Sequence, residues 1–158
     1  MPTTSWNSSK RSCWVFLRTE VVNWRKHHER FCTKHSCHTK KQTHRVVFEV
    51  NVDGAEQWQG ILNNVENLQK SFGSGTTELE VVAHGKGLGL ILKINESMRA
   101  RLQLVSGAGV CFAACENTMR RLNLKLEDLM PFATTVDSGV AEVVLKQEAG
   151  WSYIKSGS

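Results

Sequence analysis

The amino-acid sequence predicts an α/β protein with a mainly parallel five-stranded sheet that is covered by helices on both faces. From Arg45 onward, short runs rich in β-branched and aromatic residues alternate with segments whose apolar residues recur at helical spacing. Glycine clusters separate several of these segments. Strands that alternate with helices pair in parallel through right-handed crossovers, which place the helices on the faces of the sheet. The 158 residues are enough for one ordinary domain of this kind.

The first half of this domain contains two predicted strands and one predicted helix. The first strand spans residues 46–52, where β-branched residues predominate, and a turn signal follows it. A helix is expected over residues 58–68, because apolar residues recur there every three or four positions before glycines end the pattern. The second strand, residues 79–84, leads into a glycine-rich segment at 85–89.

The second half of the domain supplies the other three strands. The expected elements are, in chain order, a helix over 98–105, a strand over 111–115, a short helix over 126–130 and a strand over 134–136. Ser138 is placed to cap a last helix, which Gly150 ends. A closing strand is expected over residues 151–154.

Positive charge is concentrated at the start of the chain. Residues 1–44 hold nine Lys and Arg against two Glu, a balance of +7, whereas the remainder holds 11 basic against 13 acidic residues, a balance of −2. We therefore expect a basic extension over residues 1–43, disordered or partly helical, followed by an α/β domain over residues 44–158. Because the domain is mildly acidic, we expect no nucleic-acid-binding surface on it.

The extension contains one amphipathic pattern and one cluster of potential metal ligands. Apolar residues between Trp14 and Phe31 recur every three or four positions, with basic residues between them. This pattern indicates either a basic helix that docks on a partner or an anionic membrane surface, or a solvated, poorly ordered segment. The ligand cluster lacks a C-x2-C pair, so we expect no native metal site there; it consists of Cys32, His35, Cys37 and His38.

The sequence gives no sign of membrane insertion or secretion. No apolar run approaches the ~18 residues of a membrane span. No apolar segment followed by a small-residue cleavage site appears near Met1. We therefore expect a cytoplasmic protein without a membrane span.

The segment around Cys115 is the strongest candidate for chemistry. A short apolar run ends at this cysteine and good helix formers follow, so Cys115 is expected where a strand turns into a helix. The N–H groups and positive dipole end of a helix start favour a thiolate, whereas the charge of Glu116 opposes it. Cys111 would lie about 13 Å away along an extended strand, too far for a disulfide, and we interpret it as a core residue. Alternatively, both cysteines are small buried hydrophobic residues.

Residues with polar or reactive side chains lie at or just past the carboxyl ends of three predicted strands: Asn51, Asp53, His84 and Cys115. Because the carboxyl ends of parallel strands meet at one edge of the sheet, these residues are expected to line one crevice. His84 is a candidate general base or charge partner for Cys115, or else a hydrogen-bonded structural residue. The backbone at Gly85 and Gly87 is suited to receive an anion, or the two glycines only allow a tight turn.

These considerations give a specific set of predicted site residues. We predict Cys115 and His84 as the catalytic residues. The spacing of the glycines at 85–89 matches neither the dinucleotide fingerprint nor the P-loop, so no nucleotide is inferred, and we expect no other cofactor and no metal. The predicted ligand-binding residues are Asn51, Gly85, Gly87, Glu116 and Asn117.

Four segments of the chain together resemble the DsrE/DsrF-like family, specifically its small stand-alone members. They are HRVVFEVNVDGAEQWQGILNNVENL, ELEVVAHGKGLGLIL, GVCFAACENTMRRL and SGVAEVVLKQEAGWSYIK, and the match covers roughly residues 44–155. The resemblance implies a flavodoxin-like three-layer sandwich that assembles into homotrimers or homohexamers. It also implies that Cys115 matches the cysteine through which some members relay sulfane sulfur as a persulfide. The extension before residue 44 departs from the family pattern.

The observations lead to three functional hypotheses. The first is a cytoplasmic, homo-oligomeric, sulfur-carrier-like protein in which Cys115 takes sulfur from a donor protein and hands it to an acceptor protein. Its activity would be at most persulfide transfer, without a cofactor. The alternative is a non-catalytic subunit whose crevice binds a small ligand or anion, or which serves as a scaffold. A third hypothesis is that the basic extension tethers the domain to nucleic acid or to a membrane.

Overall fold

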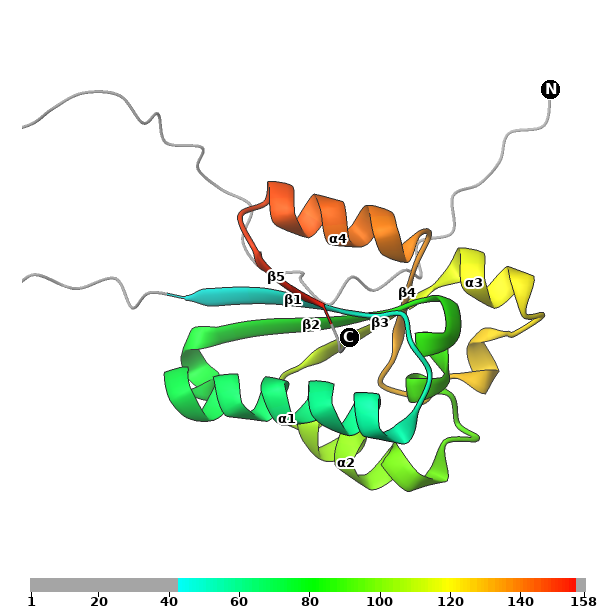
Figure 1. The fold of residues 1–158 in the computed structure, drawn as a ribbon, viewed down its shortest axis with the longest axis horizontal. Coiled ribbons are helices and arrows are strands. Elements are labelled where there is room, and N and C mark those ends of the chain that lie inside the picture. The colour runs from blue at the N-terminus through cyan, green and yellow to red at the C-terminus, as the bar shows by residue number, and fades with distance from the viewer. Residues whose placement is uncertain (1–42, 156–158) are drawn as a thin grey trace, which may run out of the picture.

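The computed structural model describes residues 43–155 and contains a five-stranded, wholly parallel sheet (Figure 1). Across the sheet the strand order is β4-β3-β2-β1-β5, so the first four strands follow one another and the last returns to the opposite edge. The expected sheet is confirmed. The strands are β1 (His44–Val50), β2 (Thr77–Ala83), β3 (Cys111–Cys115), β4 (Thr134–Val136) and β5 (Ser152–Lys155).

Helices cover both faces of the sheet. Figure 1 shows α1 and α2 on one face, and among the described helices α4 lies on the other. As α4 carries the chain from β4 back to β5, it contacts β1, β2, β3 and β5. The predicted three-layer, flavodoxin-like sandwich is therefore confirmed. The α-helices are α1 (Ala55–Phe72), α2 (Glu96–Gly107), α3 (Glu116–Arg121) and α4 (Gly139–Glu148), and the 3-10 helices are η1 (Ser74–Thr76), η2 (Gly85–Ile91) and η3 (Leu126–Asp128).

Two hydrophobic cores of unequal size lie on the two faces of the sheet. Successive side chains of a strand point to opposite faces, so β1, β2 and β3 contribute alternate residues to each core. The larger core lies on the face that α1 and α2 cover, and its largest fully buried members include Phe48, Phe112, Leu62, Leu90 and Leu102. The smaller core lies under α4 and consists of Val47, Val82, Ala113, Val143 and Trp151.

A buried ion pair also fixes α4 to the sheet. Glu80 in β2 is only 4% exposed, and its carboxylate pairs with the ammonium group of Lys146 in α4. Lys146 also lies 3.4 Å from Glu142 and 4.4 Å from the centroid of the Trp151 ring. A carboxylate that is removed from water is costly unless a charged group compensates it. The pair therefore fixes which residues of α4 face the sheet.

Three element boundaries differ from the sequence predictions. The segment expected as a glycine-rich turn at 85–89 forms η2. The short helix expected over 126–130 is only the three-residue η3, because the Asp128 carboxylate accepts a hydrogen bond from the Lys125 N–H and the chain is extended again at Leu129. The first strand, expected to run to residue 52, ends at Val50. The carbonyl of Val50 accepts a hydrogen bond from the N–H of His84, the residue that immediately precedes η2.

The predictions for the amino-terminal extension concern residues outside those that the structure describes. They are the amphipathic pattern between residues 14 and 31 and the Cys/His cluster at 32–38. Within residues 43–155, no group of three or more His, Cys, Asp and Glu side chains is placed to hold a metal ion. None of the helices in this part of the chain is both long and apolar enough to cross a membrane.

Gly87 allows η2 to pack directly on the end of β1. A Cβ atom at this position would overlap the carbonyl group of Val50 and would lie 2.8 Å from the backbone nitrogen of Asn51. All of these atoms belong to the backbone, so they cannot rotate away as a side chain would. The glycine is therefore required for the close approach that places His84 and Gly85 beside the end of β1.

We predict that Gly87→Ala lowers the free energy of unfolding by about 1–3 kcal/mol, because the extra carbon overpacks a rigid contact. Gly60→Ala is the matched control. Gly60 lies inside α1 with no atom within 4 Å of its Cβ position, so this change should raise the free energy of unfolding by roughly 0.5–1 kcal/mol. Urea titration of both variants measures these values, and equal stabilities would contradict the proposed role of Gly87.

Candidate functional site

Polar side chains form an oblique row across four strands on the face that α4 covers. Val47, Val82 and Ala113 point into the core under α4, so the residues two positions further along each strand point the same way. These residues are Glu49, His84 and Cys115. Tyr153 of β5 pairs in register with Val47 and therefore lies on the same face as Glu49. The row thus runs in the order Tyr153, Glu49, His84, Cys115.

Cys115 is the residue at which β3 ends and α3 begins, as the sequence predicts. It is a free thiol, only 5% exposed, with extended backbone angles at the cap position of α3. Burial alone would raise the pKa of Cys115. Hydrogen bonds from the Thr118 hydroxyl and from the N–H groups of Gly139, Thr118 and Asn117 outweigh burial, so the pKa is lower than that of an ordinary thiol. The surroundings of the sulfur therefore favour the thiolate more than burial alone would.

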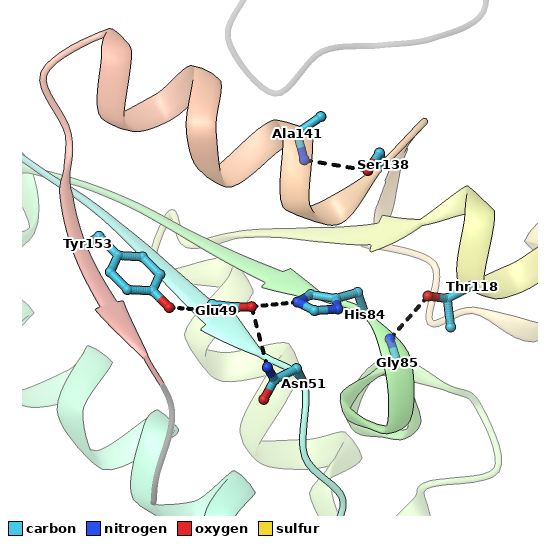
Figure 2. Close-up of polar contacts among 8 residues, drawn as sticks. All are labelled: Glu49, Asn51, His84, Gly85, Thr118, Ser138, Ala141 and Tyr153. Carbon is cyan, nitrogen blue, oxygen red and sulfur yellow. Dashed lines mark hydrogen bonds and ion pairs between the residues drawn. The ribbon is translucent and has the colours of Figure 1, made fainter.

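The starts of two helices converge on this sulfur atom. Asn117 and Thr118 belong to the first turn of α3, whereas Gly139 is the first residue of α4. The N–H of Asn117 is also 3.2 Å from the carbonyl oxygen of Asp137, which ties the start of α3 to the segment that leads into α4. The side chain of Ser138 then caps α4 by accepting a hydrogen bond from the Ala141 N–H, as Figure 2 shows.

Gly139 brings α4 into contact with both predicted catalytic residues. A Cβ atom at this position would lie 3.0 Å from the Cβ of His84 and 3.2 Å from the Cβ of Cys115. These contacts are tighter than ordinary van der Waals contact, so a larger residue would require the surrounding atoms to shift. His84 and Cys115 can consequently be no farther apart at their Cβ atoms than the sum of these two distances. The structure therefore brings the two residues together.

Thr118 links the glycine-rich segment to the thiol. Its hydroxyl oxygen accepts a hydrogen bond of 3.0 Å from the Gly85 N–H (Figure 2). The Thr118 hydroxyl in turn donates a hydrogen bond to the sulfur of Cys115. Because a hydroxyl group donates one hydrogen bond, acceptance from Gly85 favours the orientation in which the hydroxyl proton points to sulfur. Gly85, predicted as a ligand-binding residue, thus acts on the site through Thr118.

Glu49, which is not among the predicted site residues, is the centre of the polar row. Its carboxylate accepts hydrogen bonds from the Tyr153 hydroxyl, from Nε2 of His84 at 2.7 Å and from the Asn51 amide at 3.4 Å (Figure 2). Burial raises the pKa of Glu49. The hydrogen bonds from Tyr153 and His84 and the nearby positive charges lower this pKa by more than burial raises it, so the net pKa is below the usual value. Glu49 is therefore ionised at neutral pH.

The contact with Glu49 shifts the pKa of Tyr153 in the opposite direction, upward. Burial and the hydrogen bond that the hydroxyl donates to Glu49 raise the pKa of Tyr153 to about 12. The negative charge of Glu49 adds to this effect, because it disfavours a second anion beside it. The hydroxyl of Tyr153 consequently keeps its proton and stays a donor to Glu49 throughout the physiological pH range.

The other predicted ligand-binding residues are held by contacts within the protein. The Gly87 N–H donates to the carbonyl oxygen of His84 at 3.0 Å. The carboxylate of Glu116 accepts a hydrogen bond of 2.8 Å from Thr135, and the side-chain oxygen of Asn117 accepts one from Arg120. Asp53 does not join the row, since its carboxylate accepts a hydrogen bond from the Gly54 N–H before α1.

Sequence reasoning missed Glu49, Tyr153, Thr118 and Gly139. Glu49 carried a usable signal, because it is an acidic residue inside the apolar run Val46–Val50 and lies two positions before Asn51. The other three carried no comparable signal. Their roles depend on the return of β5 to the side of β1 and on the close packing of α4, which local patterns do not reveal.

We predict that Thr118→Val raises the pH midpoint of Cys115 alkylation by about one unit, because a hydrogen bond to a charged group is lost. Thr118→Ser keeps the hydroxyl and is the matched control, so its midpoint should stay close to that of the unchanged protein. Alkylation is followed on the peptide that contains Cys115 by mass spectrometry. Equal midpoints for the valine and serine variants would show that the hydroxyl does not stabilise the thiolate.

Tyr153 is the single tyrosine of the chain, so its ionisation can be read directly from the ultraviolet absorbance of tyrosinate. We predict a midpoint of about 12. Because the folded state holds this proton more tightly, the contact stabilises the fold fully below the unfolded value of ~10, and the stabilisation is lost as the pH rises through the folded pKa. Glu49→Gln should move the midpoint down toward ~10. A midpoint near ~10 in folded, unchanged protein would contradict the Tyr153–Glu49 contact.

Comparison with known proteins assigns the chain to a family. The DsrE/DsrF-like family matches residues 46–156. The solved structure of a protein of unknown function from Methanobacterium thermoautotrophicum is similar, with 31% sequence identity and a TM-score of 0.67, over 71% of this chain and 98% of that chain. No curated protein matches the chain. The chain therefore belongs to the DsrE/DsrF-like family, as its sequence motifs and its parallel five-stranded sheet indicate.

Proposed function

We propose that this protein is a sulfur carrier that takes up sulfane sulfur on Cys115 as a persulfide and hands it to an acceptor protein. The observation that carries the proposal is the set of hydrogen bonds that converge on the Cys115 sulfur and lower its pKa. Sulfur exchange requires a thiolate as the attacking group, and the starts of two helices supply donors that favour it. Membership of the DsrE/DsrF-like family suggests a sulfur-relay role at the level of the family.

His84 completes the proposed catalytic pair. It lies at the carboxyl edge beside Cys115, with Gly139 in contact range of both side chains, and Glu49 fixes its ring. A histidine in this position is suited to take up the thiol proton when the thiolate forms. The proposed ligand-binding residues would surround the incoming sulfur compound, and they are Asn51, Gly85, Gly87, Glu116 and Asn117.

We further propose that the protein acts in the cytoplasm as a homo-oligomer, a homotrimer or homohexamer, that meets separate donor and acceptor proteins. Apolar side chains on the outer side of α4 support self-association, because Val140, Val144 and Leu145 are each about half exposed or more. Contact between copies through this helix would remove those side chains from water. Family membership is consistent with such an assembly.

Burial of Cys115 favours a second candidate function. A thiol that is 5% exposed is less accessible than most reactive cysteines. In this alternative the protein is a non-catalytic subunit that binds a small ligand or anion at the same edge, and Cys115 performs no chemistry. The N–H groups of Gly85 and Gly87 lend this alternative little support, since each already donates within the protein.

Loading with a low-molecular-weight persulfide separates the two candidates. We predict that the peptide containing Cys115 gains the mass of one sulfur atom, and that this sulfur is released to cyanide as thiocyanate. Cys115→Ser should abolish both events, because the serine hydroxyl is a weak nucleophile that does not form a persulfide. Unchanged loading and release in Cys115→Ser, or no loading of the unchanged protein, would rule out the carrier and leave the binding subunit.

A further inference from the structure

Glu49 is a charged residue whose part in the proposed sulfur chemistry depends on its contact with His84. Its side chain is 14% exposed. Three donors surround its carboxylate: Tyr153 in β5, His84 just past β2 and Asn51 just past β1. Glu49 is not a member of the smaller hydrophobic core under α4. A largely buried ion that is fully provided with donors is costly to assemble, and such clusters are typical of functional sites.

The ionised carboxylate determines which nitrogen of His84 can exchange a proton. An ionised carboxylate only accepts hydrogen bonds, so Nε2 of His84, 2.7 Å from Glu49, must carry the proton in that contact. Nδ1 is therefore the ring nitrogen that takes up and releases a proton. This nitrogen is bonded to the ring carbon next to Cβ, and the Cβ of His84 lies near that of Cys115 across the Gly139 position.

Tyr153 and Asn51 in turn hold Glu49. Tyr153 donates to the second carboxylate oxygen, whereas Asn51 and His84 both donate to the first. With both oxygens engaged, the carboxylate cannot rotate without losing a hydrogen bond. The row therefore fixes the plane and the tautomer of the His84 ring.

We propose that Glu49 is a positioning residue that keeps His84 as the acid for the departing thiol, so that the site takes sulfur from persulfides of ordinary alkyl thiols. The inference rests on the proposed sulfur carriage. Alkyl thiolates are poor leaving groups because their conjugate thiols have high pKa values, and a proton donor at the site removes this disadvantage.

The step balances without an oxidant or reductant. The Cys115 thiol first gives its proton to Nδ1 of His84. The thiolate then attacks the outer sulfur of the donor persulfide, a new S–S bond forms at Cys115, and the S–S bond of the donor breaks. The donor sulfur leaves with the bonding electron pair and takes the proton from Nδ1. The products are the Cys115 persulfide, the free donor thiol and neutral His84.

Thiol–disulfide exchange with two reagents tests this role independently of persulfide uptake. An aromatic disulfide releases a thiolate that needs no proton, whereas a simple alkyl disulfide releases a thiolate that does. We expect Glu49→Gln to slow the reaction of Cys115 with the alkyl disulfide by roughly 10- to 100-fold. The rate of its reaction with the aromatic disulfide should stay within about twofold of the rate in the unchanged protein. Tyr153→Phe should show the same selectivity with a smaller loss.

Glu127→Gln is the matched control, because Glu127 is an exposed carboxylate in η3 that pairs with Lys125. It should leave both rates unchanged. If Glu49→Gln slows the reactions with both disulfides equally, Glu49 has a structural role only. If it slows neither reaction, Glu49 has no role in them. Each result overturns the inference. If the unchanged protein reacts with both disulfides but takes up no persulfide sulfur, the proposed function fails separately.

Discussion

The contact between the start of α4 and the ends of β2 and β3 determines the geometry of the whole candidate site. Gly139 packs closely between His84 and Cys115, because a Cβ atom at this position would lie 3.0 Å and 3.2 Å from their Cβ atoms. This contact places a backbone N–H against the thiol, limits the separation of His84 and Cys115, and closes the small core that Val143 and Trp151 complete. The buried pair of Lys146 with Glu80 maintains it from the other end of the helix.

One physical rule accounts for the three shifted acids of the polar row. Burial raises the pKa of Cys115, Glu49 and Tyr153 alike, because each becomes charged when it loses its proton. The hydrogen bonds then decide the outcome. The sulfur and the carboxylate accept hydrogen bonds, which stabilise their charged forms, whereas the Tyr153 hydroxyl donates one to an anion, which stabilises its neutral form. The row therefore combines a thiol whose pKa is lowered with an ionised carboxylate and a neutral phenol at its edge.

The sequence allowed prediction of those features that depend on local patterns. The strand that ends at Cys115, the helix that follows it and the position of His84 beyond β2 all have local signals of periodicity, capping and turn residues. The roles of Glu49 and Tyr153 depend on β5 pairing with β1, although 104 positions separate the two residues along the chain. The close packing of Gly139 appears only when α4 is assembled on the ends of β2 and β3, because the local sequence does not show which residues lie beside the start of the helix.

The pH dependence of Cys115 alkylation in the unchanged protein tests the central claim most directly. The midpoint reports the thiolate population, and slow entry of the reagent into a buried site changes the rate but not the midpoint. We expect a midpoint clearly below the ~8.5 of a free thiol, because four hydrogen bonds to the sulfur outweigh its burial. A midpoint at or above ~8.5 would mean that burial prevails, and Cys115 would then lack the reactivity that sulfur carriage requires.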